Sequence, residues 1–396
     1  RTDPSDAGFS APRLALIRAA LERDIAAGLL PGAVVGIGRR GRIAYLEAIG
    51  QRDPASGQPM WADAVFSIAS MTKPMTSVAI MMLAEEGRLL LGDPASKFLP
   101  QMANMKVAKS PTADTLETVP AEREMTVQDL LRHTSGLTNG NRGTSPAYRA
   151  YPESGGTAAS RLSREEFLET IGKVPLLYQP GTAWEYGFST DVLGHIVEAV
   201  SGQSLGAFLK ARLWEPLGMA DTSFTLSRAA EGRYARALAK CPLTGQAQFV
   251  LHASGQPQKW ESGGGGAVST AADYLRFVEM LRAGGTFAGT RILGRKTIDL
   301  MRADHLGPEI QNRITTMDPA FNGYGFGLGF AVRKTAGVAA AYGTAGDYYW
   351  SGVYGTYFWI DPAEELSVVF MAAAPGQIRL RYRQLLRALV LQAMVD

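Results

Sequence analysis

Hydrophobic and polar positions follow different patterns at the ends and in the middle of this chain. Apolar positions recur at helical spacing over 12–27, and Gly28 ends that pattern. Two apolar runs at 33–38 and 43–48 are typical of strands joined by a tight turn at 39–42. β-type runs at 325–333, 354–360 and 366–372 precede a last helical pattern at 380–394. Both terminal portions are therefore expected to contribute strands.

The middle of the chain is mainly helical in pattern. A helix is expected from Thr126, its N-cap, to about His133. Irregular segments are expected at 101–124 and 138–157. Further helices are predicted at 164–171, 191–200, 205–213 and, after a four-glycine turn at 263–266, at 269–285.

This order of elements predicts an α+β fold. Strands at both ends favour an antiparallel sheet flanked by helices, built from residues 1–80 and 225–396. Residues 81–224 would then form an inserted, mainly helical lobe.

Composition excludes several classes of function. The chain has 396 residues, 46% hydrophobic and 19% charged, as in soluble globular proteins, and its 40 Lys and Arg are scattered among 37 acids. Nucleic acid is therefore not an expected partner. The single cysteine, Cys241, excludes an internal disulfide, and the four histidines are far apart without zinc spacing, so no metal or cofactor is expected.

No apolar run approaches the ~20 residues of a membrane-spanning helix, so no membrane span is expected. The sequence begins at Arg1 and leaves the compartment open between the cytoplasm and the periplasm of a bacterial-type cell. The oligomeric state is left open as well.

A lysine near the start of a strongly apolar helix is the first sign of chemistry. In the stretch 66–87, Ser70 precedes Lys73 by three residues, so the two side chains would share one helix face. Apolar surroundings and the positive end of the helix dipole both disfavour a charged amine there. Lys73 could therefore be a base for Ser70, although the tetrapeptide alone also fits a plain N-cap with a surface lysine.

Two other serines are weaker candidates. Ser204 matches the G-x-S-x-G pattern formally, but that elbow needs a preceding strand, and 191–200 is helical in pattern. Ser204 is therefore expected to be an N-cap. Ser351 lacks a nearby base and is expected to lie in a strand. His133 and His195 are expected to be packed structural residues.

Further motifs accompany Ser70 and Lys73. Tyr186 lies in a short loop before a helix, and Trp350-Ser351-Gly352 begins a segment, 347–362, that is expected to run as a strand. At these residues the chain resembles the class C β-lactamase and DD-peptidase superfamily of serine hydrolases, and within it the family VIII carboxylesterases. The resemblance also takes in "LLRHTSGL", "PLGMADTSF" and "GGGGAVSTAADYLRF", and it extends from about residue 33 to the C-terminal part.

The resemblance implies an active site between the two parts of the fold, and it implies roles for individual residues. Ser70 would be acylated, while Lys73 and Tyr186 would share the proton transfer; which of them is the primary base stays open. The backbone N–H groups of Ser70 and Val353 would hold the oxyanion. An alcohol could replace water, giving acyl transfer as a side activity.

Two departures from the superfamily pattern favour ester substrates. Phe188 stands where an asparagine would bind an amide side chain, and Trp350 replaces the lysine of the K-T-G strand. The stretch 334–337 matches K-T-G except for one extra residue, but it lies upstream of that strand. The residues expected to line the substrate pocket are Phe188, Tyr348, Tyr349, Trp350, Gly352 and Tyr354.

We therefore expect a serine carboxylesterase that acts on small, short-chain esters. A β-lactamase, DD-peptidase or D-aminopeptidase acting on amides is one alternative. A non-catalytic, penicillin-binding-like module is the other.

Overall fold

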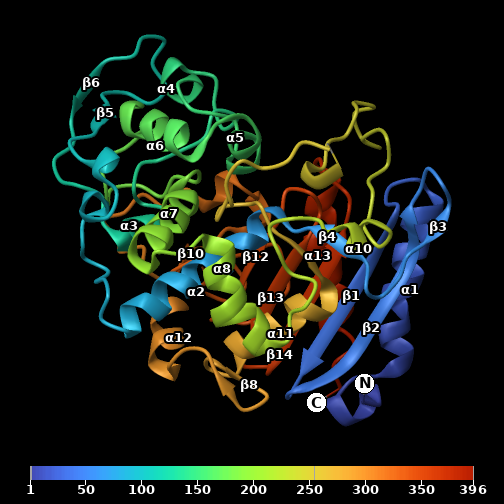
Figure 1. Cartoon of the computed structure of the whole chain (residues 1–396). Helices are drawn as coiled ribbons and strands as arrows, with labels where there is room; N and C mark the ends of the chain where they lie inside the picture. Colours follow the sequence, from blue (N-terminus) through green and yellow to red (C-terminus); the bar gives the residue numbers. More distant parts are fainter. Residues whose placement is uncertain (1, 254, 396) are drawn as a thin grey trace.

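An eight-stranded antiparallel sheet runs through the centre of the computed structural model, which describes residues 2–253 and 255–395 (Figure 1). Its strands follow the order β10-β11-β12-β13-β14-β1-β2-β3. The N-terminal portion supplies β1 (Gly32–Arg39), β2 (Arg42–Asp53) and β3 (Gln58–Pro59). The C-terminal portion supplies β10 (Tyr324–Phe326), β11 (Ala331–Arg333), β12 (Tyr348–Ser351), β13 (Tyr357–Asp361) and β14 (Leu366–Ala372). Because β1 pairs with β14, both portions of the chain form one sheet, as the hydrophobic pattern predicts.

The β1–β2 hairpin lies where the sequence places it. Its two turn residues, Arg40 and Gly41, have φ values of 52° and 73°. Two positive φ values in a two-residue turn match the right-handed twist of the flanking strands.

Two C-terminal predictions are wrong in extent, because each segment contains a glycine turn. The run 325–333 is the β10–β11 hairpin, and Gly329 between its strands has φ 117°, which favours glycine. The segment 347–362 is the β12–β13 hairpin rather than one strand. The backbone N–H of Gly352 donates to the carbonyl of Thr356 and closes that turn.

Helices cover both faces of the sheet (Figure 1). On one face, α11 (Ala271–Arg282) packs over β1, β13 and β14. On the other, α1 (Ala11–Ala26) packs against α13 (Ile378–Leu391), and Tyr382 of α13 stacks on Phe370 of β14 with ring centroids 5.7 Å apart. The sheet is therefore buried between helical layers, as an α+β fold requires.

The other elements lie between the two halves of the sheet in the sequence. The helices are α2 (Thr72–Glu85), α3 (Val127–Leu131), α4 (Pro146–Arg149), α5 (Gly155–Arg161), α6 (Arg164–Lys173), α7 (Ser189–Ser201), α8 (Leu205–Leu209), α9 (Glu215–Leu217), α10 (Arg228–Glu231) and α12 (Arg295–Met301). The two-stranded pairs are β4 (Val65–Ser67) with β7 (Val268–Thr270), β5 (Lys106–Ala108) with β6 (Thr118–Pro120), and β8 (Thr286–Phe287) with β9 (Thr290–Arg291). Figure 1 shows α4, α5, α6 and the β5–β6 pair together at one end of the molecule, away from the central sheet.

Most predicted helices are confirmed. Thr126 caps α3 in a capping box with Asp129. The irregular segments contain more structure than expected, because 101–124 holds the β5–β6 pair and 138–157 holds α4. The division into residues 1–80 with 225–396 and an inserted lobe of 81–224 stays a prediction.

Within the described ranges, no single helix combines the length and the apolar composition needed to cross a membrane. The segments Ser189–Ser201 and Leu205–Leu217 meet that test only as a pair, bent by 78°. In the fold, Val192, Leu193 and Ile196 of α7 are fully buried in the core.

Candidate active site

Ser70 lies at the junction between β4 and α2. It sits in a 3-10 turn, Ala69–Met71, that runs directly into α2, so Lys73 is the second residue of that helix. Ala69 has φ 45°, a strained value for a residue with a side chain, immediately before Ser70. Lys73 is only 5% exposed. Its Nζ donates to Ser70 Oγ at 3.3 Å and to the carbonyl of Gly264 at 2.5 Å.

The third predicted residue, Tyr186, also contacts Ser70. The hydroxyl of Tyr186 donates to Ser70 Oγ at 2.7 Å, although the two residues are 116 positions apart. Lys73 Nζ lies 4.6 Å from the centroid of the Tyr186 ring. The structure thus brings together Ser70, Lys73 and Tyr186, which lie in two separate motifs of the sequence.

The four-glycine turn forms the far side of the lysine site. Gly264 accepts from Lys73, while its own N–H donates to Asp191 Oδ1 at 3.1 Å. Ser262 also donates to this carboxylate, at 2.5 Å. Burial raises the pKa of Asp191, and nearby Lys73 acts in the opposite direction. A Cβ on Gly264 would overlap Asp191, which explains a glycine at this position.

Aromatic rings enclose Tyr186. The ring of His133 lies 4.9 Å from it and that of Trp350 lies 5.4 Å from it. Burial, followed by the charges of Lys73 and Arg142, holds the pKa of His133 well below its usual range. The carbonyl of His133 accepts from the N–H of Glu185, the residue before Tyr186. His133 is thus buried, as expected, but it also contacts the tyrosine of the candidate site.

Ser70 and Tyr186 open into a cavity of about 510 Å³. Of the residues predicted to line a substrate pocket, Tyr349 and Trp350 contribute to its wall. The full lining consists of Ser70, Asn139, Asn141, Arg142, Tyr148, Ser154, Tyr186, Arg313, Thr316, Met317, Tyr349, Trp350, Ser351, Val353, Gln377, Arg379 and Arg383.

The other predicted pocket residues are not part of this wall. Tyr348 is buried and packs against Phe330 with ring centroids 4.9 Å apart. Phe188 packs edge-on against Phe167, in the core. Tyr354 contacts Phe249, and Gly352 closes the β12–β13 turn.

Val353 belongs to a turn rather than to a strand. It is 46% exposed and lines the cavity between β12 and β13. The hydroxyl of Thr356 in the same turn donates to the carbonyl of Ile68 at 3.1 Å, which ties this turn to the segment before Ser70. The oxyanion role of the Ser70 and Val353 N–H groups stays a prediction.

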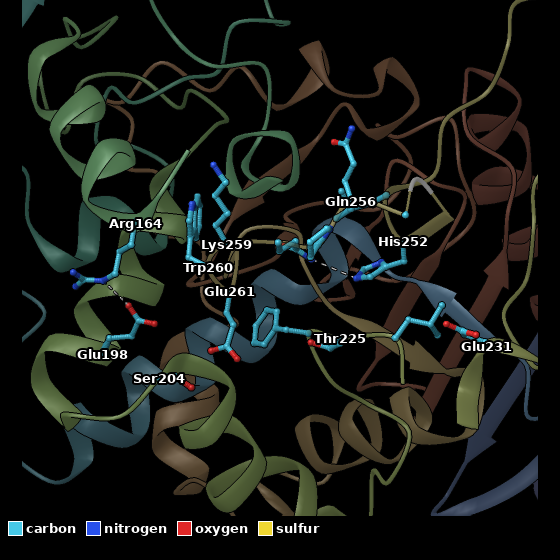
Figure 2. A pocket seen from close by; sticks show the side chains of 16 residues that line it. Arg164, Glu198, Ser204, Thr225, Glu231, His252, Gln256, Lys259, Trp260 and Glu261 are labelled. Carbon is cyan, nitrogen blue, oxygen red and sulfur yellow. Dashed lines mark hydrogen bonds and ion pairs between the residues drawn. The ribbon is translucent and has the colours of Figure 1, made fainter. Parts of the chain in front are cut away.

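A second cavity, of about 630 Å³, contains the rejected nucleophile Ser204 (Figure 2). Ser204 is the N-cap of α8, and its Oγ accepts from the N–H of Ala207 at 3.2 Å. Figure 2 shows Ser204 together with Glu198 and Glu261 in the wall of this cavity. The expected capping role of Ser204 is therefore confirmed.

Sequence reasoning missed a buried carboxylate next to Tyr186. Glu185 is 1% exposed and pairs with Arg313 at 2.8 Å and with Arg142 at 3.3 Å. Arg142 and Arg313 both line the active-site cavity. Arg142 and Arg313 lie in distant loops and share no motif with Glu185. The one signal in the sequence is the acidic residue directly before Tyr186.

Across the described parts of the chain, no group of three His, Cys, Asp or Glu side chains is arranged to hold a metal ion.

Comparisons with known proteins identify the same serine hydrolases. The Beta-lactamase family model matches residues 17–392. Protein Rv1367c of Mycobacterium tuberculosis is 35% identical over 352 residues, covering 87% of this chain and 86% of that protein. Esterase EstB of Burkholderia gladioli is 32% identical over 388 residues, covering 93% of each chain. The solved structure of EstCE1, described as a hydrolase with promiscuous acyltransferase activity, has a TM-score of 0.78 at 28% identity, covering 96% of this chain and 98% of its own.

Proposed function

We propose that this chain, which belongs to the β-lactamase family and is a serine hydrolase of its esterase branch, cleaves small short-chain carboxylic esters through a covalent acyl-enzyme. The observation that carries the proposal is the double contact on one oxygen. Ser70 Oγ lies 2.7 Å from the Tyr186 hydroxyl and 3.3 Å from Lys73 Nζ. Two proton-transferring groups within reach of one serine are what an activated nucleophile needs.

The chemistry proceeds in two halves. Ser70 Oγ attacks the ester carbonyl carbon, and its proton passes to the Lys73–Tyr186 pair. The tetrahedral intermediate then collapses, the carbon–oxygen bond to the alcohol breaks, and the pair returns the proton to the departing alkoxide. Water repeats the sequence on the acyl-enzyme and releases the acid. An alcohol in the place of water gives a new ester, which is acyl transfer.

The oxyanion of both tetrahedral intermediates would accept hydrogen bonds from the N–H groups of Ser70 and Val353. The cavity position of Val353 and the hydrogen bond from Thr356 to Ile68 support this assignment. Loss of one such donor typically costs ~10²–10³ in turnover.

Two observations support esters over amides. Trp350 and Tyr349 give its wall an aromatic surface where the related lactamases carry a lysine. Phe188 is packed in the core and offers no amide group to a substrate side chain. The names of EstB, an esterase, and EstCE1, a hydrolase with acyltransferase activity, support ester hydrolysis and acyl transfer.

Fluorophosphonate labelling with mass spectrometry of the labelled peptide tests the nucleophile. We expect label on Ser70 and hydrolysis of p-nitrophenyl butyrate, both abolished in Ser70→Ala with an unchanged circular dichroism spectrum. Ser204→Ala is the matched control and should behave like wild type. Label or turnover that survives in Ser70→Ala would move the role to another serine.

Nitrocefin and p-nitrophenyl butyrate at matched concentrations test the substrate class. Faster turnover of the ester supports the esterase. Faster turnover of nitrocefin would favour a β-lactamase. The absence of both labelling and turnover would favour a non-catalytic module.

A further inference from the structure

Asp191 is a buried carboxylate that the proposed reaction steps do not yet use. It lies in the first turn of α7 and is only 2% exposed. It forms no direct ion pair with any described residue. Its Oδ1 accepts hydrogen bonds from the Ser262 hydroxyl at 2.5 Å and from the N–H of Gly264 at 3.1 Å. Burial of a carboxylate is unfavourable unless hydrogen bonds and a nearby opposite charge compensate it.

Lys73 supplies the opposite charge through a shared neighbour. The carbonyl of Gly264 accepts from Lys73 Nζ at 2.5 Å, while the N–H of the same residue donates to Asp191. One residue of the turn therefore joins the lysine and the carboxylate. Burial raises the pKa of Asp191, whereas the charge of Lys73 and the two hydrogen bonds favour its ionised form.

The backbone around Asp191 leaves room for its side chain and for little more. A Cβ on Gly264 would overlap the carboxylate, and so would a Cβ on Gly155, the first residue of α5. Two segments that are distant in sequence thus approach Asp191 without side chains of their own. Asn has nearly the same shape as Asp, so Asp191→Asn removes the charge with little change in packing.

Other charged or titratable groups near Tyr186 are neutral or already paired. The ring of His133 lies 4.9 Å from the Tyr186 ring, and burial holds the pKa of His133 well below its usual range, so this ring is neutral near pH 7. Arg142 lies 5.8 Å from the centroid of the Tyr186 ring and pairs with Glu185 at 3.3 Å.

The other side of Asp191 faces a histidine that has its own acid. His195 follows Asp191 by one turn of α7, and its Nδ1 lies 2.9 Å from Glu198 Oε2. Further cations line the active-site cavity and are the same in every variant compared below; they are Arg313, Arg379 and Arg383. The charge of Asp191 can therefore be changed while its charged surroundings stay constant.

We propose that Asp191 is a positioning residue for proton transfer. Through the turn 262–266 it holds Lys73 at the nucleophile, and its negative charge stabilises the Lys73–Tyr186 pair while that pair carries the serine proton. This inference rests on the proposed function, since it concerns the proton transfer of the same site. As Ser70 Oγ bonds to the carbonyl carbon, its proton moves to the pair, which is neutral overall before the transfer and positive after it. A negative charge behind the lysine favours the positive state, whichever of the two groups holds the proton.

The pH dependence of the reaction tests this role. In Asp191→Asn the pair should release its proton at lower pH, because the negative charge is gone. We therefore expect the acidic limb of kcat/KM for p-nitrophenyl butyrate to move about one pH unit or more toward lower pH. The plateau should fall about 10- to 100-fold, because the pair becomes a weaker base. The rate of fluorophosphonate labelling of Ser70 should show the same shift of the limb, and it requires no ester turnover.

Asp273→Asn is the matched control. Asp273 is also buried, at 6% exposure, and it also accepts two hydrogen bonds, from the N–H of Asp221 at 2.8 Å and from the Thr222 hydroxyl at 3.0 Å. Its charged neighbours are Asp221 and Arg276 rather than Lys73. This variant should keep the acidic limb of the wild type, even where thermal unfolding shows a loss of stability. If Asp191→Asn does not fold, Asp191→Ser, with a smaller side chain, serves for the same measurement.

The outcomes separate this inference from the proposed function. If Ser70 is labelled and the ester is hydrolysed, but the acidic limb does not move in Asp191→Asn, the role of Asp191 is overturned and the esterase stands. A lower plateau without a shift would have the same meaning, since it shows support of the turn alone. If nitrocefin is the faster substrate, the limb is measured with nitrocefin, and a shift upholds the role of Asp191 without the esterase. If wild-type Ser70 is not labelled at all, both proposals are wrong.

Discussion

The position of Lys73 is explained by the three groups that its amine contacts. Its amine lies between Ser70 Oγ and the Gly264 carbonyl and beside the ring of Tyr186. The lysine is therefore anchored at the nucleophile, where a proton can move a short distance.

Removal of either proton carrier should stop turnover. We expect Lys73→Ala and Tyr186→Phe each to lower kcat/KM for p-nitrophenyl butyrate by about 100- to 10,000-fold, the usual scale of general acid–base catalysis. Stopped-flow or steady-state release of p-nitrophenol measures the loss. Thermal unfolding serves as the control, because Tyr186→Phe keeps the ring contacts with His133 and Trp350. If a variant retains more than a tenth of the wild-type kcat/KM, the substituted residue is not one of the proton carriers.

At the scale of residues, the reacting groups could be predicted from the sequence, whereas the groups around them could not. Ser70, Lys73 and Tyr186 stand in recognisable motifs. Glu185 does not, because its importance comes from contacts with distant loops, such as its pair with Arg313. The resemblance predicts Phe188 in the pocket, at the position of a substrate-binding asparagine, whereas its side chain is buried in the core.

Among the elements, the turn between β12 and β13 has the most direct influence on the site. Gly352 closes this turn, Val353 follows on the cavity wall, and Thr356 donates to the carbonyl of Ile68, two residues before Ser70. A Cβ on Gly352 would overlap both Thr356 Oγ1 and the Ile68 carbonyl. The spacing between this turn and the nucleophile therefore depends on a missing side chain.

Gly352→Ala should disturb activity and stability together. Forced separation of two packed segments typically costs about 1–3 kcal/mol of unfolding free energy. We expect kcat for p-nitrophenyl butyrate to fall about tenfold or more, because small displacements at a reacting centre are costly. Urea unfolding and steady-state kinetics measure the two effects. Gly232→Ala is the matched control, since Gly232 has φ −65° and no atom within 4 Å of an added Cβ. Equal behaviour of the two variants would contradict this account.

Element boundaries were predictable where one signal dominated. The Thr126 cap and the apolar stripe of α1 fixed their helices, since each depends on residues close in sequence. The β12–β13 hairpin was missed because its turn lies within a continuous apolar and aromatic run. There the decisive factor is pairing with β11 and β14, which is a long-range contact.

For the molecule as a whole, the C-terminal helix links the sheet to the active-site cavity. Arg387 of α13 is fully buried and donates to both oxygens of Asp347, at 2.9 and 3.2 Å. Its Nε donates to the Tyr357 hydroxyl of β13 at 2.7 Å. The same helix presents Arg379 and Arg383 to the cavity. Attachment of α13 to the sheet thus also positions these two side chains in the cavity wall.

Stability of the whole fold should depend on pH through its buried histidines. Burial lowers the pKa of His252 to about 4, while its Nδ1 lies 2.6 Å from Ser67 Oγ. An unfolded histidine titrates near 6.5, so the unfolded chain gains its proton first as the pH falls. The unfolding free energy is therefore undiminished above pH ~6.5 and decreases toward pH 4, by up to about 1.4 kcal/mol per pH unit for this residue.

His252→Gln isolates this contribution from those of His133 and His305, whose pKa values burial also lowers. Urea unfolding of wild type and variant at several pH values between 7.5 and 4 should give two curves that differ in slope below pH ~6.5, with the flatter curve for the variant. Buried carboxylates such as Asp129 and Asp191 are present in both proteins, so their titration changes both curves equally and the difference between the curves reports His252. Parallel curves across the window would mean that His252 does not stay neutral in the folded protein while the unfolded chain takes up its proton.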